Sequence, residues 1–260
     1  NGTNWIQLGA DIDGEAASDY SGNPVSLSSS GSTVAIGAYG NDGNGTDSGH
    51  VRIYNYKGST WTQLGEDING EAAGDQSGRS VSLSSDGTIV AIGAFLNDGN
   101  GSSSGHVRIH KYKGNSWTQL GEDINGEAAG DQSGYSVSLS SDGKTVAIGA
   151  TENDVNGASS GHVRIYNYND TDWAQLGADI DGEAASDYSG YSISLSSDGA
   201  SVAIGAIGND GNGTDSGHVR VYNLVLENKK PIAVADKKTV KEDSSLTSID
   251  VIINDTDEDG

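Results

Sequence analysis

The sequence contains no cysteine, no methionine, one phenylalanine and two prolines in 260 residues, and 37 Asp and Glu outnumber 14 Lys and Arg. Without cysteine the chain can form no disulfide, no thiolate zinc site and no cysteine nucleophile. The net charge of −23 repels phosphate backbones and anionic lipid, which argues against nucleic acid or a membrane surface as a partner. No run of about 18 apolar residues is present, so we expect no direct insertion into a membrane.

The sequence is also poor in large apolar side chains. Only 33% of the residues are apolar, whereas 39 are glycine. Such a chain has to fold with many small side chains and extensive hydrogen bonding, as β-rich repeat proteins do. Because it starts at Asn1 with neither an initiator methionine nor a signal peptide, we expect it to be a mature or excised piece of something longer.

An internal repeat of 56 residues runs through the chain without insertion or deletion. It recurs at four tryptophans and four histidines: Trp5, Trp61, Trp117 and Trp173, then His50, His106, His162 and His218. A fifth tryptophan would fall at position 229, where the sequence has Lys229. The array therefore consists of four repeats.

Each repeat holds four short strand-like segments, which we name A to D in chain order. In the second repeat they are A at 80–84, B at 88–94, C at 105–110 and D at 117–120. Serine alternates with Val81 and Leu83 in segment A, and Asp86-Gly87 forms a tight turn between A and B. Four antiparallel strands in a unit of this length predict an all-β fold, a β-propeller with four 56-residue blades followed by a short β tail.

The ends of the array leave two arrangements open. The array begins on a D segment, Trp5 to Leu8, and ends after a C segment, His218 to Tyr222. Either the N-terminal segment completes the fourth blade and closes a four-bladed ring, or the four blades form an arc of a larger ring. Closure would hide the outer edge of the last blade, which is otherwise free to pair with another chain.

The motifs W-x-Q-L-G, D-x-S-G-Y-S-V-S-L-S-S-D-G-K-T-V-A-I-G-A and S-G-H-V-R-I-Y resemble the FG-GAP repeat of integrin-α-like bacterial β-propellers. The resemblance covers residues 5 to about 224, and we assign 1–226 to this propeller. It implies a secreted or surface-exposed propeller for adhesion or ligand binding, usually with seven blades. Here Ser77-Gly78 replaces the family's Phe-Gly, and the A–B connection is too short for the integrin-type calcium loop, so those metal ligands cannot be transferred.

Residues 227–260 differ from the repeats. The stretches 228–236, 241–243 and 249–260 resemble the opening of a cadherin-like or immunoglobulin-like tandem module of large bacterial surface adhesins. A complete sandwich needs about 100 residues, so we interpret 227–260 as a linker and the truncated start of such a domain. The resemblance implies a bacterial cell-surface location, and the truncated tail is a candidate for self-association.

Acidic residues concentrate in the D–A and B–C connections, which open on the same face of a propeller. These connections hold 23 of the 37 carboxylates. The D–A connection carries oxygen donors at relative positions 1, 3, 5 and 9 around a glycine, a pattern that suits Ca²⁺. The same side chains can instead cap turns through bonds to the backbone, and both interpretations remain open. The candidate metal ligands are Asp11, Asp13, Glu15, Asp19, Asp67, Asn69, Glu71, Asp75, Asp123, Asn125, Glu127, Asp131, Asp179, Asp181, Glu183 and Asp187.

The B–C connections supply candidates for ligand contact, with a flexible turn or a metal site as alternatives. These residues are Asp42, Asn44, Asp98, Asn100, Asp154, Asn156, Asp210 and Asn212. For the histidines that begin segment C we expect hydrogen bonds between blades. Each arginine two residues later is expected to pair with an acid or stack on tyrosine, and the tryptophans to pack on the outer strand.

The function that these features favour is non-enzymatic binding or adhesion at the bacterial surface, with a glycan or protein engaged through acidic, Ca²⁺-assisted loops. The alternative is a structural spacer or knob in a filamentous adhesin, without a ligand of its own. A propeller glycosidase or lyase is disfavoured, because near-identical repeats offer no set of different residues in different catalytic roles.

Overall fold

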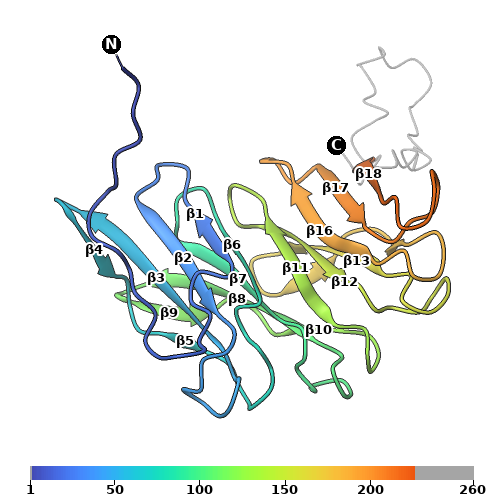
Figure 1. Ribbon diagram of the computed structural model, residues 1–260, viewed down its shortest axis with the longest axis horizontal. Helices are drawn as coiled ribbons and strands as arrows, with labels where there is room; N and C mark the ends of the chain where they lie inside the picture. The colour runs from blue at the N-terminus through green and yellow to red at the C-terminus, as the bar shows by residue number, and fades with distance from the viewer. Residues whose placement is uncertain (1, 226–260) are drawn as a thin grey trace, which may run out of the picture. The chain divides into compact units, whose positions relative to one another are not determined.

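The computed structural model describes residues 2–225, and within them all regular secondary structure is β-strand (Figure 1). The predicted all-β propeller fold is therefore confirmed. No helix among the described residues is long and apolar enough to cross a membrane. The prediction of a cadherin-like or immunoglobulin-like start at 227–260 lies outside the described residues.

Within residues 2–225 the strands form four antiparallel sheets, one for each repeat. In the first sheet the order is β1 (Val25–Leu27), β2 (Thr33–Ala38), β3 (His50–Lys57), β4 (Thr60–Gln63), with β5 (Ile68–Asn69) also on β3. The second contains β6 (Ser80–Leu83), β7 (Ile89–Ala94), β8 (His106–Lys113), β9 (Ser116–Gln119) and β10 (Ile124–Asn125). The third contains β11 (Ser133–Leu139), β12 (Thr145–Ala150), β13 (His162–Tyr168), β14 (Trp173–Gln175) and β15 (Ile180–Asp181). The fourth contains β16 (Ser189–Leu195), β17 (Ser201–Ala206) and β18 (His218–Asn223).

The A–B hairpin forms where Asp86-Gly87 predicts it. Asp86 accepts a bond from the backbone nitrogen of Thr88 at 2.9 Å, and the Ser84 hydroxyl accepts one from the nitrogen of Ile89 at 2.9 Å. Gly87 has a φ of 72°, which a residue without a Cβ adopts at little cost. This turn sets the register in which Val81 lies opposite Ile92.

Consecutive sheets pack through their first strands, with β1 beside β6, β6 beside β11 and β11 beside β16. Between the second and third sheets, Ile89 and Val107 belong to one buried cluster with Leu139 and Ile148. On strand β7, Gly93 lies so close to the backbone of the third sheet that an added Cβ would collide with the Gly134 carbonyl oxygen. Small residues therefore let neighbouring blades approach, which explains how a chain with few large apolar side chains buries a core.

The second, third and fourth D–A connections each contain a short strand that the sequence pattern does not reveal, β5, β10 and β15. In the first of these strands, β5, Ile68 pairs with Val51 and Asn69 with His50. Ile68 is buried and anchors this two-residue segment against β3. The strand matters for the site because it holds the acidic connection against the beginning of strand C.

The ring closure proposed above stays a prediction. The segment Trp5 to Leu8 forms no strand, and the side chain of Trp5 is fully exposed. Among the described residues, β18 has only β17 as a neighbour in its sheet. Its Val219 and Val221 are 68% and 69% exposed.

Candidate functional site

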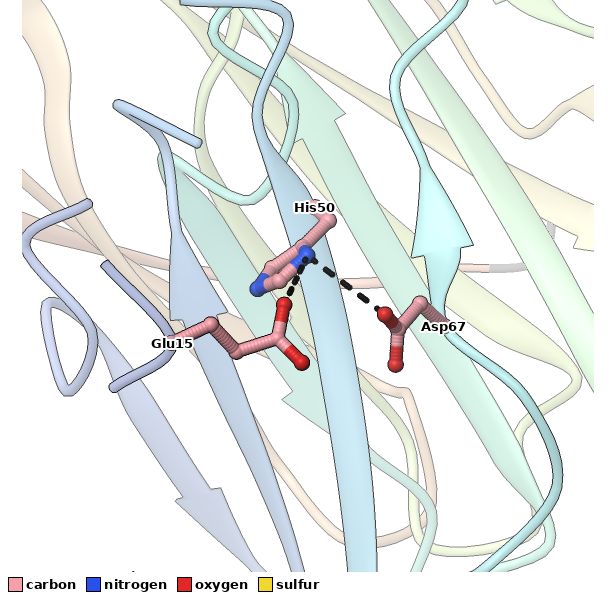
Figure 2. Close-up of side chains that lie close together, drawn as sticks. All are labelled: Glu15, His50 and Asp67. Atoms are coloured by element: carbon pink, nitrogen blue, oxygen red, sulfur yellow. Dashed lines mark ion pairs between the residues drawn. The ribbon is translucent and has the colours of Figure 1, made fainter. Parts of the chain in front are cut away.

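Three side chains from separate segments meet where strand C begins (Figure 2). Glu15 lies in the connection before β1, His50 is the first residue of β3, and Asp67 directly precedes β5. The Nδ1 atom of His50 lies 3.8 Å from Oε2 of Glu15 and 3.9 Å from Oδ2 of Asp67. The histidine is almost fully buried, whereas the Glu15 and Asp67 side chains are 45% and 30% exposed. A buried nitrogen is thus presented to two carboxylates that solvent can reach.

In the part of the chain that the structure describes, the repeat builds this triplet three times: Glu15, His50 and Asp67; Glu71, His106 and Asp123; and Glu127, His162 and Asp179. The fourth histidine, His218, lies 3.7 Å from Glu183 but belongs to no complete triplet among the described residues. We refer to the three complete groups as the His–Glu–Asp triplets.

Each carboxylate of a triplet is held by a neighbour through one of its oxygens. In the second triplet, Arg108 lies 3.4 Å from Oε1 of Glu71, while Oε2 faces His106 at 3.9 Å. Gln119 donates a bond of 2.6 Å to Oδ1 of Asp123, while Oδ2 faces His106 at 3.8 Å. The free oxygens of both acids therefore point to the same ring nitrogen. The expected pairing of the arginines with acids is confirmed.

Burial lowers the pKa of each triplet histidine, which favours the neutral form. Burial lowers the pKa of His50, and it outweighs the opposing effect of Asp67 and Glu15. Burial, with the Arg108 guanidinium, lowers the pKa of His106 to about 4. A neutral imidazole keeps a lone pair on one ring nitrogen, which is the form that ligates a metal ion.

Of the four predicted ligand positions in a D–A connection, two meet in a triplet, but they come from consecutive connections. Position 5 of one connection, such as Glu15, meets position 1 of the next, such as Asp67. Position 3 contributes its backbone instead: the carbonyl oxygen of Asn69 accepts a 2.7 Å bond from Arg108. The equivalent acceptors are the carbonyl oxygens of Asp13, Asn125 and Asp181.

Position 9 acts as a turn cap. Asp75 is 3% exposed, and its Oδ2 accepts bonds of 3.0 Å from the nitrogen of Ala72 and from the amide of Asn97. The same contacts recur at Asp19, Asp131 and Asp187. Calcium binding by these connections stays a prediction, while capping accounts for the ninth position.

The predicted ligand-contact residues of the B–C connections lie on the surface and also join neighbouring loops. Asp98 accepts a 2.7 Å bond from the nitrogen of Ser103. Asn100 donates bonds of 2.9 and 3.0 Å to the carbonyl oxygens of Gly126 and Glu127. The aspartate contact recurs at Asp42, Asp154 and Asp210, and the asparagine contact at Asn44 and Asn156; Asn212 bonds to Ser216 through its backbone nitrogen.

Sequence reasoning missed the histidines as members of the acidic site. Hydrogen bonding between blades was expected, yet Nδ1 of His162 is buried without a hydrogen-bond partner. A signal was present in the sequence, because each triplet histidine is followed 17 residues later by the first aspartate of the next connection. That signal becomes meaningful only once β5, β10 and β15 are known to pair with the start of strand C.

A hollow of about 390 Å³ includes Asp67 of the first triplet in its lining, together with Arg108, His110 and Trp117 among others. Equivalent hollows of about 300 and 260 Å³ contain Tyr54 and Tyr166 in place of His110. The acidic face is therefore indented beside each outer strand.

Comparison with known proteins gives a family match. The model described as "FG-GAP repeat" matches residues 11–54, 69–109 and 174–222, together more than half of the chain. No curated protein matches the chain.

Among solved structures, Kuenenia stuttgartiensis hydrazine synthase is similar, at 12% identity and a TM-score of 0.47 over 86% of this chain. The chain spans just over half the length of that protein, 56%. A likeness of this size carries no argument about activity.

Proposed function

The chain belongs to the FG-GAP repeat family, and we propose that it is a non-enzymatic binding module of a large bacterial cell-surface protein. Its acidic loop face engages a glycan or a surface protein, and Ca²⁺ assists that contact. The resemblance of 227–260 to the start of a cadherin-like or immunoglobulin-like module supports placement in an adhesin outside the cell. The same tail is a candidate for self-association.

The observation that carries the proposal is the convergence of solvent-accessible carboxylates on one set of loops. Glu71 and Asp123 are 44% and 29% exposed, and each turns one oxygen toward the same point. Paired carboxylates at an exposed loop attract cations, and a bound cation can in turn coordinate a hydroxyl or carboxylate of a partner. We assign no catalytic role, because the triplets are near-identical copies and lack the functional division that a catalytic site needs.

A structural role is the second candidate, and one observation favours it. The asparagines of the B–C connections use their side-chain amides within the molecule, as Asn100 does toward Gly126 and Glu127. A surface whose polar groups already have internal partners suits a spacer or knob in a filamentous adhesin, without its own ligand.

A glycan array and a pull-down from host-surface extracts, each with Ca²⁺ and with EDTA, distinguish these candidates. The binding module gives a saturable partner whose binding is lost in EDTA and in the double variant Glu71→Gln with Asp123→Asn. Glu66→Gln is the matched control, because Glu66 is an exposed acid of the same connection and belongs to no triplet. Absence of any saturable partner, with unchanged cell attachment in the double variant, favours the spacer.

A further inference from the structure

The His–Glu–Asp triplets combine a nitrogen donor with two oxygen donors, and this combination does not suit Ca²⁺. Calcium takes six to eight oxygen ligands on proteins. Imidazole together with carboxylate is the donor set of Zn²⁺ and related first-row ions. The chemistry of the triplet therefore separates it from the rest of the acidic face.

The histidine–carboxylate distances in a triplet are longer than hydrogen bonds and close to the separation of two ligands on one ion. His106 Nδ1 lies 3.9 Å from Glu71 and 3.8 Å from Asp123, beyond the hydrogen-bond range of about 2.7–3.2 Å. Two ligands bound at about 2.0–2.2 Å to one tetrahedral ion lie about 3.3–3.6 Å apart. The histidine–carboxylate distances exceed this by a few tenths of an ångström, and all donor atoms of a triplet lie within 4.8 Å of one another. Side-chain rotation of the two exposed acids can therefore bring the three donors onto one ion.

A second observation points independently to a ligand. Nδ1 of His162 has no hydrogen-bond partner, and the residue is only 1% exposed, so bulk water does not satisfy this nitrogen. It lies 3.8 Å from Glu127. Buried polar nitrogens in folded proteins nearly always have a partner, and an unpaired atom of this kind indicates a bound water or ion. The nitrogen faces Glu127, and the donor atoms of His162, Glu127 and Asp179 all lie within 4.8 Å of one another.

The surrounding residues orient the donors as metal sites require. Arginine holds the outer oxygen of each glutamate, at 3.5 Å for Arg52 and Glu15. Glutamine holds the outer oxygen of each aspartate, at 2.6 Å for Gln63 and Asp67. Such supporting contacts fix the rotamers of metal ligands and leave the inner oxygens free.

We infer that each of the three His–Glu–Asp triplets binds one divalent transition-metal ion of the Zn²⁺ type, with the fourth coordination position open to water. The ion ties the connection that leaves one sheet to strand C of the next, since Glu71 follows β5 whereas His106 begins β8. This inference rests on the proposed function in that it assigns a cation to the same loop face. The paired carboxylates of the triplets hold the Zn²⁺-type ion, and Ca²⁺ assistance falls to the other acids of that face.

Zn²⁺ titration of chelator-treated protein at pH 7.5, by calorimetry and by competition with a chromophoric chelator, tests this inference. The expected result is three ions per chain, retained in excess Ca²⁺. His106→Gln and, separately, Asp123→Asn each lower the stoichiometry to two. His218→Gln, at the incomplete position, leaves it at three. Circular dichroism checks that each variant is folded. If the buried His106→Gln variant does not fold, the Asp123→Asn variant alone decides the stoichiometry.

Substitution with Co²⁺ adds a readout of geometry, because tetrahedral Co²⁺ absorbs strongly in the visible. No saturable Zn²⁺ binding, or an unchanged stoichiometry in a folded Asp123→Asn variant, overturns the inference. Ca²⁺-dependent ligand capture without Zn²⁺ binding would overturn this inference alone. Zn²⁺ binding with no captured ligand would leave it standing and contradict the proposed function.

Discussion

The indole nitrogen of Trp173 donates a 2.7 Å hydrogen bond to the carbonyl oxygen of Leu120, which lies in the connection of the preceding sheet. Trp117 makes the same bond to Leu64, and Trp61 to Leu8. Each outer strand is thereby fastened to the preceding blade. The expectation that the tryptophans pack on the outer strands is met at these three positions.

Trp173→Phe is expected to lower the free energy of unfolding by about 1–3 kcal/mol, through the lost hydrogen bond and lost apolar burial. Trp5→Phe is expected to change it by less than about 0.5 kcal/mol, because Trp5 is fully exposed. Urea denaturation of both variants measures the difference. An equal loss in Trp5→Phe would contradict this prediction and support a ring closed by the N-terminal segment.

Gly93 in the second sheet and Gly205 in the fourth occupy equivalent positions of the repeat but have different surroundings. An added Cβ at Gly93 would collide with the backbone oxygen of Gly134 in the next sheet, whereas at Gly205 it would meet the Ser192 hydroxyl. Gly93→Ala is therefore expected to cost at least about 2 kcal/mol, since backbone cannot yield as a side chain can. Gly205→Ala, the matched variant, should cost clearly less in thermal unfolding. Similar losses in both would mean that strand propensity, rather than blade contact, selects glycine.

The sequence carries the blade pattern locally but not the site. Alternation of serine with Val81 and Leu83 predicts β6, and Asp86-Gly87 predicts its turn, because both depend on neighbouring residues. The two-residue strand β10 leaves no periodic pattern to detect.

The triplets are also hidden from local patterns. Glu71, His106 and Asp123 are 35 and 17 residues apart, and only the stacking of two sheets brings them together. The loop motif suggested instead that its own acids converge within one connection. Strands β5, β10 and β15 prevent this. Each holds the first position of its own connection beside strand C, while the ninth position caps a turn within the connection.

Asp75→Ala tests the capping role of the ninth position. Its carboxylate satisfies the nitrogen of Ala72 and the amide of Asn97, both at 3.0 Å, and the side chain is buried. Removal leaves two donors without a partner, for an expected loss of about 2–3 kcal/mol. The loss should be the same with Ca²⁺ and with EDTA. A loss seen only in the presence of Ca²⁺ would instead identify Asp75 as a calcium ligand.

His110 makes the stability of the second sheet depend on pH between about 4 and 6.5, a range in which the equivalent residues Tyr54 and Tyr166 do not titrate. Burial, with the Arg108 guanidinium, lowers the pKa of His110 to about 4 from its ordinary 6.5. The unfolded chain therefore binds a proton that the folded chain does not between these values. Stability contributed by the neutral histidine is complete above pH 6.5 and falls toward pH 4, by up to about 1.4 kcal/mol per pH unit.

His110→Tyr installs the residue found at Tyr54 and Tyr166 and should flatten the fall in melting temperature between pH 7 and 5, measured in EDTA. The slope should not vanish, because the pKa of His106 is also lowered. The hollow beside His110 is larger than that beside Tyr166, about 390 against 260 Å³, so the larger ring has room. Arg164 already lies 5.5 Å over the ring of Tyr166, a contact that Arg108 would gain and that should raise stability at pH 7. A variant with an unchanged slope would show that His110 titrates normally in the folded chain.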